Sequence, residues 1–326
     1  MSTMKDVAKI AGVSIITVSR VINSPEKVKE STRKRIQQVM TELGFQPNHT
    51  AKALVTNKTR TIHLLHPDVF DTSDPYITKL IGGISCELSE NHYSFLFRKD
   101  WEFPYKCDGV IAMGLGREED QLLKDKIDVP CVLFGRTTDI DWVNVDDVSG
   151  AYKMVTYMIS QGHKEIGMLV LDSKEPFASE RLEGYRGALE ENGIPFDPNL
   201  IQYVSALEKD GYKKTLELLE CTDISALFCS TDLLALGAIR AARELNKKVP
   251  DELSIGGYDG VWLDQIAEPQ LTTIKQPVFE IGKNLARLLI AKIENPNKSV
   301  ENILYDPELI IRKSISNKNI SKHHQN

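Results

Sequence analysis

Several features that mark common protein classes are missing from this sequence of 326 residues. No apolar run approaches the ~18 residues of a membrane-spanning helix. The N-terminus has no apolar signal-peptide core. The five cysteines are odd in number and none forms a Cys-x-x-Cys pair, which favours structural thiols in a reducing compartment over disulfides or a metal site. We therefore expect a cytoplasmic protein without membrane partners or bound metal.

The motifs of common enzyme classes are also missing. The sequence has no Gly-rich phosphate loop, no Gly-x-Ser-x-Gly elbow, no histidine pair at metal-ligand spacing and no paired catalytic carboxylates. Hydrophobic residues make up 41% and charged residues 26%, as in an ordinary globular chain that can bury sizeable cores. The length allows two domains and a small appendage. We expect a protein that is not an enzyme and needs no cofactor.

Positive charge is concentrated at the N-terminus. The whole chain has a formal net charge of −6, yet residues 1–58 carry ten Lys and Arg against four Asp and Glu, or +6. The remainder is therefore −12. This asymmetry is typical of a protein in which only a basic head contacts nucleic-acid phosphate.

The basic head contains the pattern of a helix–turn–helix. Apolar residues at helical spacing predict one core face on a first short helix: Val7, Ala8, Ile10 and Ala11. Gly12-Val13 turns the chain, and Ser14 can cap the next helix. That helix packs back through Val18, Val21 and Ile22. An ordinary two-helix corner of a larger domain has the same spacing.

The remaining positions of the second helix favour contact with DNA. The residues left for its outer face or its start are Ile15, Ile16, Thr17, Ser19 and Arg20. A recognition helix presents such positions to base edges in the major groove. Neither isoleucine can donate a hydrogen bond, so this pair would favour thymine methyl groups and leave Arg20 to read guanine.

A third helix is expected over Glu30–Leu43, with Gly44 at the left-handed cap position and Pro47 preventing continuation. Asn48–Val55 then has helical propensity, with Asn48 as a good N-cap. Eight residues are fewer than the ~12–15 that an isolated helix needs in water. The segment is therefore either a hinge that folds on DNA or a plain tether.

The head resembles that of the lactose-repressor (LacI/GalR) family. The matching residues include Asp6-Val7-Ala8, Ala11-Gly12-Val13-Ser14, Thr17-Val18-Ser19-Arg20-Val21, Asn23, Gly44-Phe45 and Pro47-Asn48. The resemblance implies base reading by Ile15, Ile16 and Arg20, and phosphate contact by Thr17, Ser19 and Asn23. It implies that Leu54 wedges into the minor groove at the centre of a palindromic operator. The complete expected set of DNA-binding residues is Ser14, Ile15, Ile16, Thr17, Ser19, Arg20, Asn23, Asn48, Ala51 and Leu54.

Beyond the head, the pattern predicts an α/β body. Expected strands and helices alternate: Arg60–Leu65, Pro75–Asn91, Tyr93–Phe97, Asp108–Met113, Glu118–Lys126 and Cys131–Phe134. The alternation resumes after Asp147 with the strands Ile166–Leu171, Ala226–Cys229 and Ser254–Tyr258 among predicted helices. Two such runs predict two lobes with parallel sheets, and ligands are expected at the carboxyl ends of the strands.

The family resemblance extends over the body, in motifs such as Val143–Asp147, Arg181–Tyr185, Ser230–Asp232, Gly257–Asp259 and Pro269–Gln276. It implies a periplasmic-binding-protein-like, two-lobed sensor in which Arg181 and Asp259 grip an effector's hydroxyl groups. A guanidinium donates in a fixed fork and an ionised carboxylate only accepts, so the pair suits that task. The other expected effector-binding residues are Tyr76, Phe134, Thr231 and Asp232. Tyr76, Phe134 and Trp262 are alternatively ordinary packing residues.

The resemblance also sets the expected domain limits. These are a head over 1–46, a hinge over 47–58, a body over 59–316 and a disordered tail over 317–326. The body divides into a proximal lobe (59–145 and 276–305) and a distal lobe (146–275 and 306–316). The chain is expected to cross between the lobes near Val145/Asp146, Lys275/Gln276 and Tyr305/Asp306.

Three features of the sequence depart from the family pattern, namely one short segment and two single positions. Only nine residues, Lys99 to Cys107, join the second and third expected strands, so the usual crossover helix should be absent, with aromatics from Trp101–Tyr105 laid over the sheet instead. Thr231 stands where the family often has Asn. Ala206 stands where some sugar sensors place an aromatic residue.

The leading interpretation is a dimeric repressor of carbohydrate-utilisation genes that a sugar or sugar derivative releases from its operator. The polar tail has no leucine heptad, so a dimer is expected rather than a tetramer. One alternative is a corepressor-type regulator that needs a metabolite or partner protein to bind DNA. A remote alternative is an α/β enzyme.

Overall fold

The computed structural model describes residues 2–23, 25–45, 58–67, 74–102, 105–297 and 299–318. It divides into two compact units, the head (Met1–Thr59) and the body (Arg60–Asn326), and each is described by itself. The expected hinge residues Asn48, Ala51 and Leu54 lie outside the described residues, as does most of the expected tail. Within the described residues, no helix combines the length and hydropathy that a membrane crossing requires.

The head is a small three-helix unit. Its elements are α1 (Met4–Ala11), α2 (Ile15–Asn23), the short η1 (Pro25–Lys27) and α3 (Glu30–Glu42). Their facing sides bury a single apolar cluster of Val7, Ala8, Ala11, Val18, Val21, Ile36 and Val39. The prediction that Ile10 shares this face is wrong, since its side chain is 57% exposed. Position 10 is one residue before Ala11 and so points about 100° away from it around the helix.

Local hydrogen bonding sets the ends of these helices. Thr3 and Asp6 form a capping box at the start of α1, in which the Asp6 amide donates to Thr3 Oγ1 and the Thr3 amide to Asp6 Oδ2. Gly12 ends α1 with φ +63°, and Gly44 follows α3 with φ +56°. Such left-handed conformations suit glycine, as the sequence predicted for Gly44. Lys29 precedes α3 without a side-chain cap.

The body contains two six-stranded sheets, one in each lobe. The proximal sheet has the strand order β11-β5-β4-β3-β1-β2, and all its pairs are parallel. Its strands are β1 (Thr61–Leu65), β2 (Ser94–Arg98), β3 (Gly109–Ala112), β4 (Cys131–Phe134), β5 (Asp141–Val145) and β11 (Asn302–Tyr305). The distal sheet has the order β12-β10-β9-β8-β6-β7, in which only β12 is antiparallel. Its strands are β6 (Ile166–Leu171), β7 (Ile201–Val204), β8 (Ala226–Cys229), β9 (Ser254–Asp259), β10 (Thr272–Lys275) and β12 (Glu308–Ile310).

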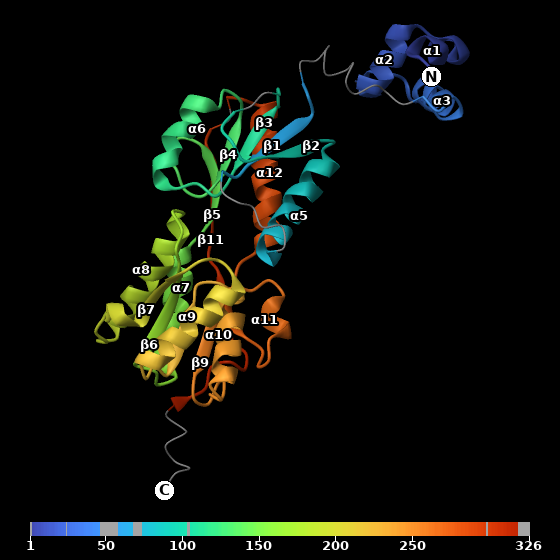
Figure 1. The fold of residues 1–326 in the computed structure, drawn as a ribbon. Helices are drawn as coiled ribbons and strands as arrows, with labels where there is room; N and C mark the ends of the chain where they lie inside the picture. Colours follow the sequence, from blue (N-terminus) through green and yellow to red (C-terminus); the bar gives the residue numbers. More distant parts are fainter. Residues whose placement is uncertain are drawn as a thin grey trace. The chain divides into compact units, whose positions relative to one another are not determined.

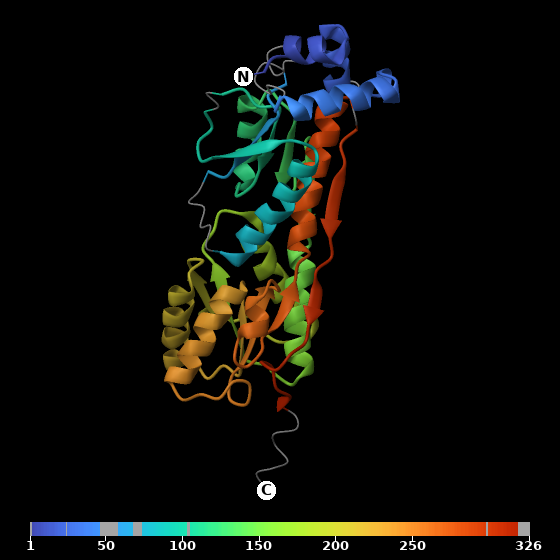
Figure 2. The same ribbon diagram turned by 90° about the vertical axis from the view of Figure 1, so that its right-hand side faces the viewer.

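Helices cover both faces of the proximal sheet. One face buries α5 (Pro75–Glu90) and α12 (Val278–Glu294), which lie side by side in Figures 1 and 2. Gly83 permits their close approach, since a Cβ atom at this position would lie 2.1 Å from the Phe279 carbonyl oxygen. The other face carries α6 (Asp120–Lys126), preceded by η2 (Arg117–Glu119). Trp101 packs there too, and no helix joins β2 to β3 among the described residues, as the short crossover predicted.

The distal sheet is also covered on both faces. Its helices are α7 (Asp147–Ser160), α8 (Pro176–Glu191), α9 (Glu208–Cys221), α10 (Asp232–Glu244) and α11 (Leu263–Ile266), with η3 (Pro198–Leu200) before β7. The apolar sides of α7 and α8 pack on one face, and those of α9 and α10 on the other. The chain passes between the two sheets three times, from β5 to α7, from β10 to α12 and from β11 to β12 (Figure 1). The predicted fold class, a helical head and a two-lobed α/β body, is confirmed.

Candidate functional site

The second helix of the head presents a mixed apolar and polar outer surface. Ser14 precedes it and accepts a hydrogen bond from the Thr17 amide at 3.1 Å, so the helix start is capped as expected. Val18 and Val21 are buried, whereas Ile15 and Ile16 are 42% and 65% exposed. Exposure of two isoleucines to water is unfavourable for the isolated head. Exposed apolar side chains of this kind are expected on a surface that a partner covers.

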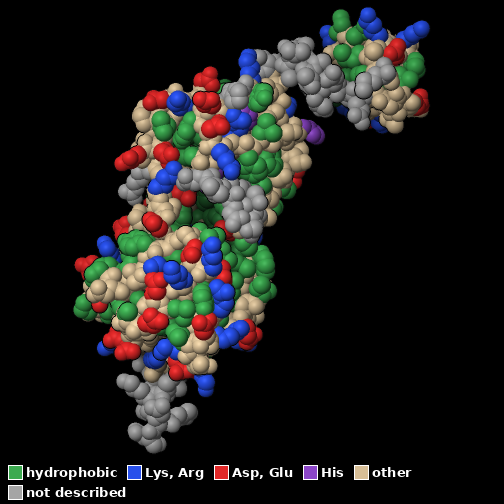
Figure 3. All heavy atoms as spheres, in the orientation of Figure 1, with side chains coloured by type: hydrophobic (Ala, Val, Ile, Leu, Met, Phe, Trp, Pro, Cys, Tyr) green, Lys and Arg blue, Asp and Glu red, His purple; other side chains and the backbone are tan. Residues whose placement is uncertain are grey.

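The remaining predicted residues of α2 lie around this pair. Arg20 is exposed, and Thr17 and Ser19 are half-buried. Asn23 is the last residue of the helix, and its side chain lies outside the described part. Lys and Arg side chains are visible over the head in Figure 3. The exposed surface of α2 therefore combines apolar atoms, hydroxyl groups and a guanidinium next to basic side chains, the chemistry that base edges and phosphates require.

The body has a cavity of about 830 Å³ between its lobes. Its walls come from the carboxyl ends of strands of both parallel sheets, including the residues that follow β3, β4, β6 and β8. In doubly wound folds this edge is the ligand-binding edge, because the chain connections leave a crevice outside the carboxyl ends of the strands. Near the cavity, Lys174 of the distal lobe forms a 3.0 Å ion pair with Glu119 of the proximal lobe.

Arg181 is the central charged group of the cavity wall. It projects from α8 and is 4% exposed, and its Nε donates to Asp147 Oδ1 at 2.7 Å. Its Nη1 donates to the Ser230 carbonyl oxygen and lies 3.9 Å from Asp259 Oδ1. Burial alone would lower the pKa of Arg181, but the nearby Asp147 and Asp259 raise it above its usual value, so the guanidinium stays charged.

Aromatic rings also hold this guanidinium. Its central carbon lies 3.7 Å from the centroid of the Tyr258 ring and 4.8 Å from that of Phe177. The cation is therefore held by cation–π contacts and ion pairs together. Its orientation is set before any ligand arrives, which lowers the entropy cost of binding.

A chain of hydrogen bonds joins the lobes at one side of the cavity. Tyr76, at the start of α5, donates from its hydroxyl to Gln276 Oε1 at 3.1 Å. Gln276, between β10 and α12, donates from Nε2 to Asp259 Oδ1 at 3.0 Å. Burial raises the pKa of Asp259 well above its usual value, although the Arg181 charge opposes this. A shift of the lobes relative to each other would therefore change the hydrogen-bond partners of the Asp259 carboxyl group, which lines the cavity.

Two residues predicted to bind the effector, Thr231 and Asp232, form hydrogen bonds within the distal lobe. Thr231 lines the cavity, but its hydroxyl caps α10 by accepting from the Leu234 amide at 3.2 Å. Asp232 is fully buried and is not among the lining residues. Its carboxylate accepts from Thr273 Oγ1 at 2.5 Å and from the Gly260 amide at 2.9 Å. Burial raises the pKa of Asp232 to about 7.

These bonds support the turn at Asp259, whose φ of +126° is unusual for a non-glycine residue. Asp232 thus lies behind the wall that presents Asp259. This arrangement suits a positioning role for Asp232 rather than direct contact with a ligand.

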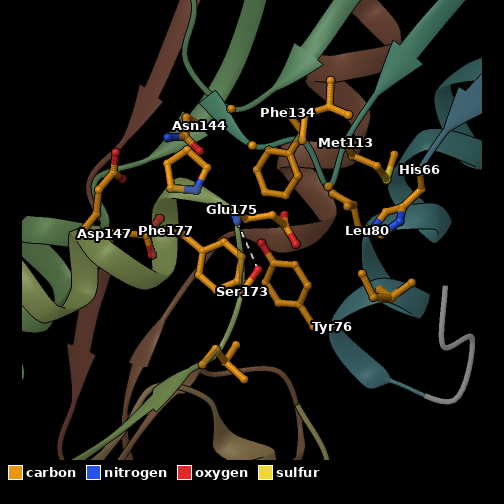
Figure 4. Close-up of a pocket in the computed structure, with 18 of the residues that line it drawn as sticks. His66, Tyr76, Leu80, Met113, Phe134, Asn144, Asp147, Ser173, Glu175 and Phe177 are labelled. Atoms are coloured by element: carbon orange, nitrogen blue, oxygen red, sulfur yellow. Dashed lines mark hydrogen bonds between the residues drawn. The ribbon is translucent and has the colours of Figure 1, made fainter. Parts of the chain in front are cut away.

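Aromatic residues from both lobes face the cavity. Figure 4 shows Phe134 from the end of β4, Tyr76 from the start of α5 and Phe177 from the first turn of α8 converging on its centre. Of the three aromatic candidates from the sequence, Tyr76 and Phe134 line the cavity. Trp262 does not, and this residue is 52% exposed beside α11. Ala206 lines the cavity without supplying a ring.

The lining residues that sequence reasoning did not select include Asp147, Phe177 and Gln276. A signal was present for Phe177, which precedes Arg181 by four residues and so shares its helix face. Asp147 and Gln276 both stand within motifs of the family resemblance. Their proximity to Arg181 and Asp259 depends on the three chain crossings, which local sequence does not specify.

Comparison with known proteins identifies the two units. Residues 3–48 match the family described as bacterial regulatory proteins, lacI family, and residues 155–315 match the periplasmic binding protein-like domain. The HTH-type transcriptional regulator YvdE of Bacillus subtilis (strain 168) is 37% identical over 96% of this chain and 99% of its own length. The chain belongs to the lacI family of bacterial regulatory proteins.

Other lacI-family members support this assignment. The HTH-type transcriptional repressor CytR of Escherichia coli (strain K12) is 33% identical over 96% of both chains. A solved structure described as a transcriptional regulator CelR–cellobiose complex is 28% identical, with a TM-score of 0.73, over 96% of this chain and all of that one. Such relatives are DNA-binding transcriptional regulators. This lacI-family chain is accordingly a DNA-binding transcriptional regulator and not an enzyme.

Proposed function

We propose that this regulator is a dimeric repressor that binds a palindromic operator and releases it when a sugar or sugar derivative enters the body cavity. The observation that carries the proposal is the ligand-sized cavity in which Arg181 and Asp259 face aromatic walls, on the same chain as the helix–turn–helix. Hydroxyl groups are recognised by such fixed donors and acceptors, and sugar rings have apolar faces that suit aromatic side chains. A relative whose structure is described as a cellobiose complex agrees with this ligand class.

In the proposal, α2 enters the major groove. Ile15 and Ile16 contact thymine methyl groups and Arg20 reads guanine, while Thr17, Ser19 and Asn23 contact the phosphate backbone. Ser14, at the start of the helix, also lies against the DNA. Asn48, Ala51 and Leu54 form the hinge at the operator centre.

Coupling between the two sites requires that the sugar bind one arrangement of the lobes more tightly than the other. The Tyr76–Gln276–Asp259 hydrogen bonds and the Lys174–Glu119 ion pair join the lobes and depend on their arrangement. A coupling free energy of about 1–3 kcal/mol would change operator affinity about 5–150-fold.

The test begins with selection of bound duplexes from a random DNA pool by the full chain. The affinity of the selected duplex is then measured by fluorescence anisotropy with and without each of a set of sugars. We expect an inverted-repeat duplex whose affinity falls at least fivefold with one sugar. A sugar that strengthens binding would instead indicate a corepressor mechanism, and a chain that selects no sequence would contradict the proposal. Sedimentation of the protein–DNA complex gives the number of protomers, for which we expect two.

A further inference from the structure

The size of the cavity restricts its ligand. At the packing density of protein interiors, one pyranose unit occupies on the order of 200 Å³. The cavity volume of about 830 Å³ therefore exceeds what a single sugar ring fills. In this arrangement of the lobes, a lone ring would leave much of the lining to water. Two or three linked rings with bridging water fill the space better.

The charges of the cavity wall restrict the ligand further. Three Lys and Arg side chains line the cavity in the described part of the chain, and each is paired with a carboxylate of the protein: Lys124 with Asp139, Arg136 with Asp146 at 4.0 Å, and Arg181 with Asp147 at 2.7 Å. Six carboxyl groups also line the cavity: Asp74, Asp147, Asp172, Glu175, Glu180 and Asp259.

A phosphorylated or carboxylated sugar would bring negative charge to a wall in which acids outnumber bases even when Asp259, whose pKa is raised by burial, is left out. To form a new ion pair it would have to displace a carboxylate from a lysine or arginine. Repulsion of this kind discriminates against an anionic ligand even when the rest of its surface fits. Hydroxyl groups, by contrast, can donate to the carboxylates and accept from the side-chain amide of Asn144, which also lines the cavity.

The shape of the wall agrees with a linked chain of rings. Phe134 from the proximal lobe and Phe177 from the distal lobe both point into the middle of the cavity, and polar residues surround them (Figure 4). An oligosaccharide alternates apolar ring faces with polar edges. Aromatic residues at the middle can therefore cover ring faces while the polar residues bind hydroxyl groups.

From these three features we infer that the effector is an uncharged oligosaccharide of two or three pyranose units, and neither a single sugar nor a sugar phosphate. The inference rests on the proposed function, because it names the ligand of the proposed effector site. It adds a size limit and a charge limit that the general ligand class does not contain.

The test measures thermal stabilisation of the full chain by matched probes at equal concentration. The probes are D-glucose and D-ribose, then maltose, cellobiose and maltotriose, then glucose 6-phosphate and trehalose 6-phosphate. A ligand that binds only the folded state raises the melting temperature. We expect at least one neutral oligosaccharide to raise it and to bind at least tenfold more tightly, by calorimetry, than either monosaccharide or either phosphate ester.

Stabilisation by only a monosaccharide or only a phosphate ester overturns the inference, and so does a panel in which nothing stabilises. The operator experiment above separates these results from failure of the proposed function. A chain that binds an operator released by ribose or by glucose 6-phosphate keeps the proposed function but not this inference. A chain that binds no operator loses the proposed function whatever sugar it binds.

A matched pair of variants tests the aromatic wall. Phe134→Leu keeps apolar volume but removes the ring face, and it should raise the dissociation constant of the oligosaccharide about tenfold. Phe97→Leu makes the same change on β2 of the same lobe, outside the cavity lining, and should leave that constant unchanged. Melting temperatures without sugar show whether each variant is folded. Equal sugar affinity in two folded variants would contradict the role of Phe134.

Discussion

At the scale of single residues, Arg181 and Asp147 form a buried ion pair in the cavity wall, and each charge compensates the other. Both side chains are almost completely buried, with exposed fractions of 5% and 4%. Removing one partner of such a pair leaves the other charge in a low-dielectric site without compensation. Arg181 is therefore expected to stabilise the distal lobe as well as being a candidate binding group.

Arg181→Ala should lower the free energy of unfolding of the body by about 3–5 kcal/mol, because Asp147 would remain buried without its partner. Urea denaturation of the full chain followed by circular dichroism measures this loss. The control is Arg186→Ala, on the same helix, where an exposed guanidinium lies 4.3 Å from the Phe196 ring centroid. The control should cost less than about 1 kcal/mol. Equal losses in the two variants would contradict the uncompensated-charge argument.

The exposed isoleucines of the head make a second prediction at this scale. Ile16 on α2 and Ile10 on α1 are 65% and 57% exposed, so truncation of either removes few packing contacts. Only Ile16 lies on the proposed recognition helix. Ile16→Ala should therefore weaken operator affinity about tenfold, the size of a lost base contact, and relax the preference for one thymine. Fluorescence anisotropy on the selected operator measures both effects. Ile10→Ala should leave operator affinity unchanged, and a loss as large as that of Ile16→Ala would contradict the assignment of α2.

At the scale of elements, His163 fixes the C-terminal segment to the distal lobe. It follows α7, and its ring is fully buried. Its Nδ1 lies 2.9 Å from Ser225 Oγ and its Nε2 lies 3.1 Å from the Ser316 carbonyl oxygen. The Lys318 amide also donates to the Gln161 carbonyl oxygen at 2.8 Å. One imidazole thus connects α7, the loop before β8 and the end of the described chain.

This connection makes the body sensitive to acid. Burial, aided by the charge of Lys318, lowers the pKa of His163 below its usual 6.5 despite the bond to Ser316. The unfolded chain therefore binds the proton more readily, so stability falls as pH drops below about 6.5 and continues to fall until the folded-state pKa is reached. Urea midpoints at pH 7.5 and 5.5 measure the loss. His163→Gln should lower stability at both pH values but reduce the difference between them. An unchanged difference would contradict this role of His163.

The strands that the sequence predicted most directly are those buried on both faces of a sheet. The strands β1, β3, β6 and β8 are buried along most of their length, and their apolar runs identified them. The edge strand β7 was not predicted, because Gln202 and Tyr203 lie outside the core and interrupt the run. The helix α12 was also not selected, although its apolar stripe is present in the sequence.

The cavity shows the same limit. The rule that ligands bind at strand ends selected Tyr76 and Phe134, and both line the cavity. The family resemblance selected Arg181, Thr231 and Asp259, and these also line it. Asp232 was selected with them yet lies behind the wall, because the Gly260 amide and the Thr273 hydroxyl bind its carboxylate. The position of Gln276 beside Asp259 depends on how the chain crosses between the two sheets. That is a property of topology and not of local spacing.

At the scale of the whole molecule, the opposite charges of head and body separate two kinds of binding. Residues 1–58 are +6 and the rest of the chain is −12, so attraction to DNA phosphate is confined to the head. The acidic body should also disfavour non-specific contact with DNA through repulsion. The proposed effector, being uncharged, binds without ion pairing to solvent-exposed groups.

Salt should therefore affect the two ligands of the same chain very differently. A dimer that makes about 6–10 phosphate contacts should lose about 10³–10⁵-fold in operator affinity between roughly 50 and 200 mM salt, because bound counterions are released from DNA. The dissociation constant of a neutral sugar should change less than about twofold over the same range, because screening acts on charged ligands. Anisotropy for the operator and calorimetry for the sugar, in identical buffers, measure both. The control is Lys213→Gln, an exposed lysine of the body with 72% of its side chain accessible, which should leave the operator slope unchanged. Operator affinity that is independent of salt would contradict phosphate contact by the head, whereas a steep salt dependence of sugar binding would contradict an uncharged effector and leave the DNA-binding role intact.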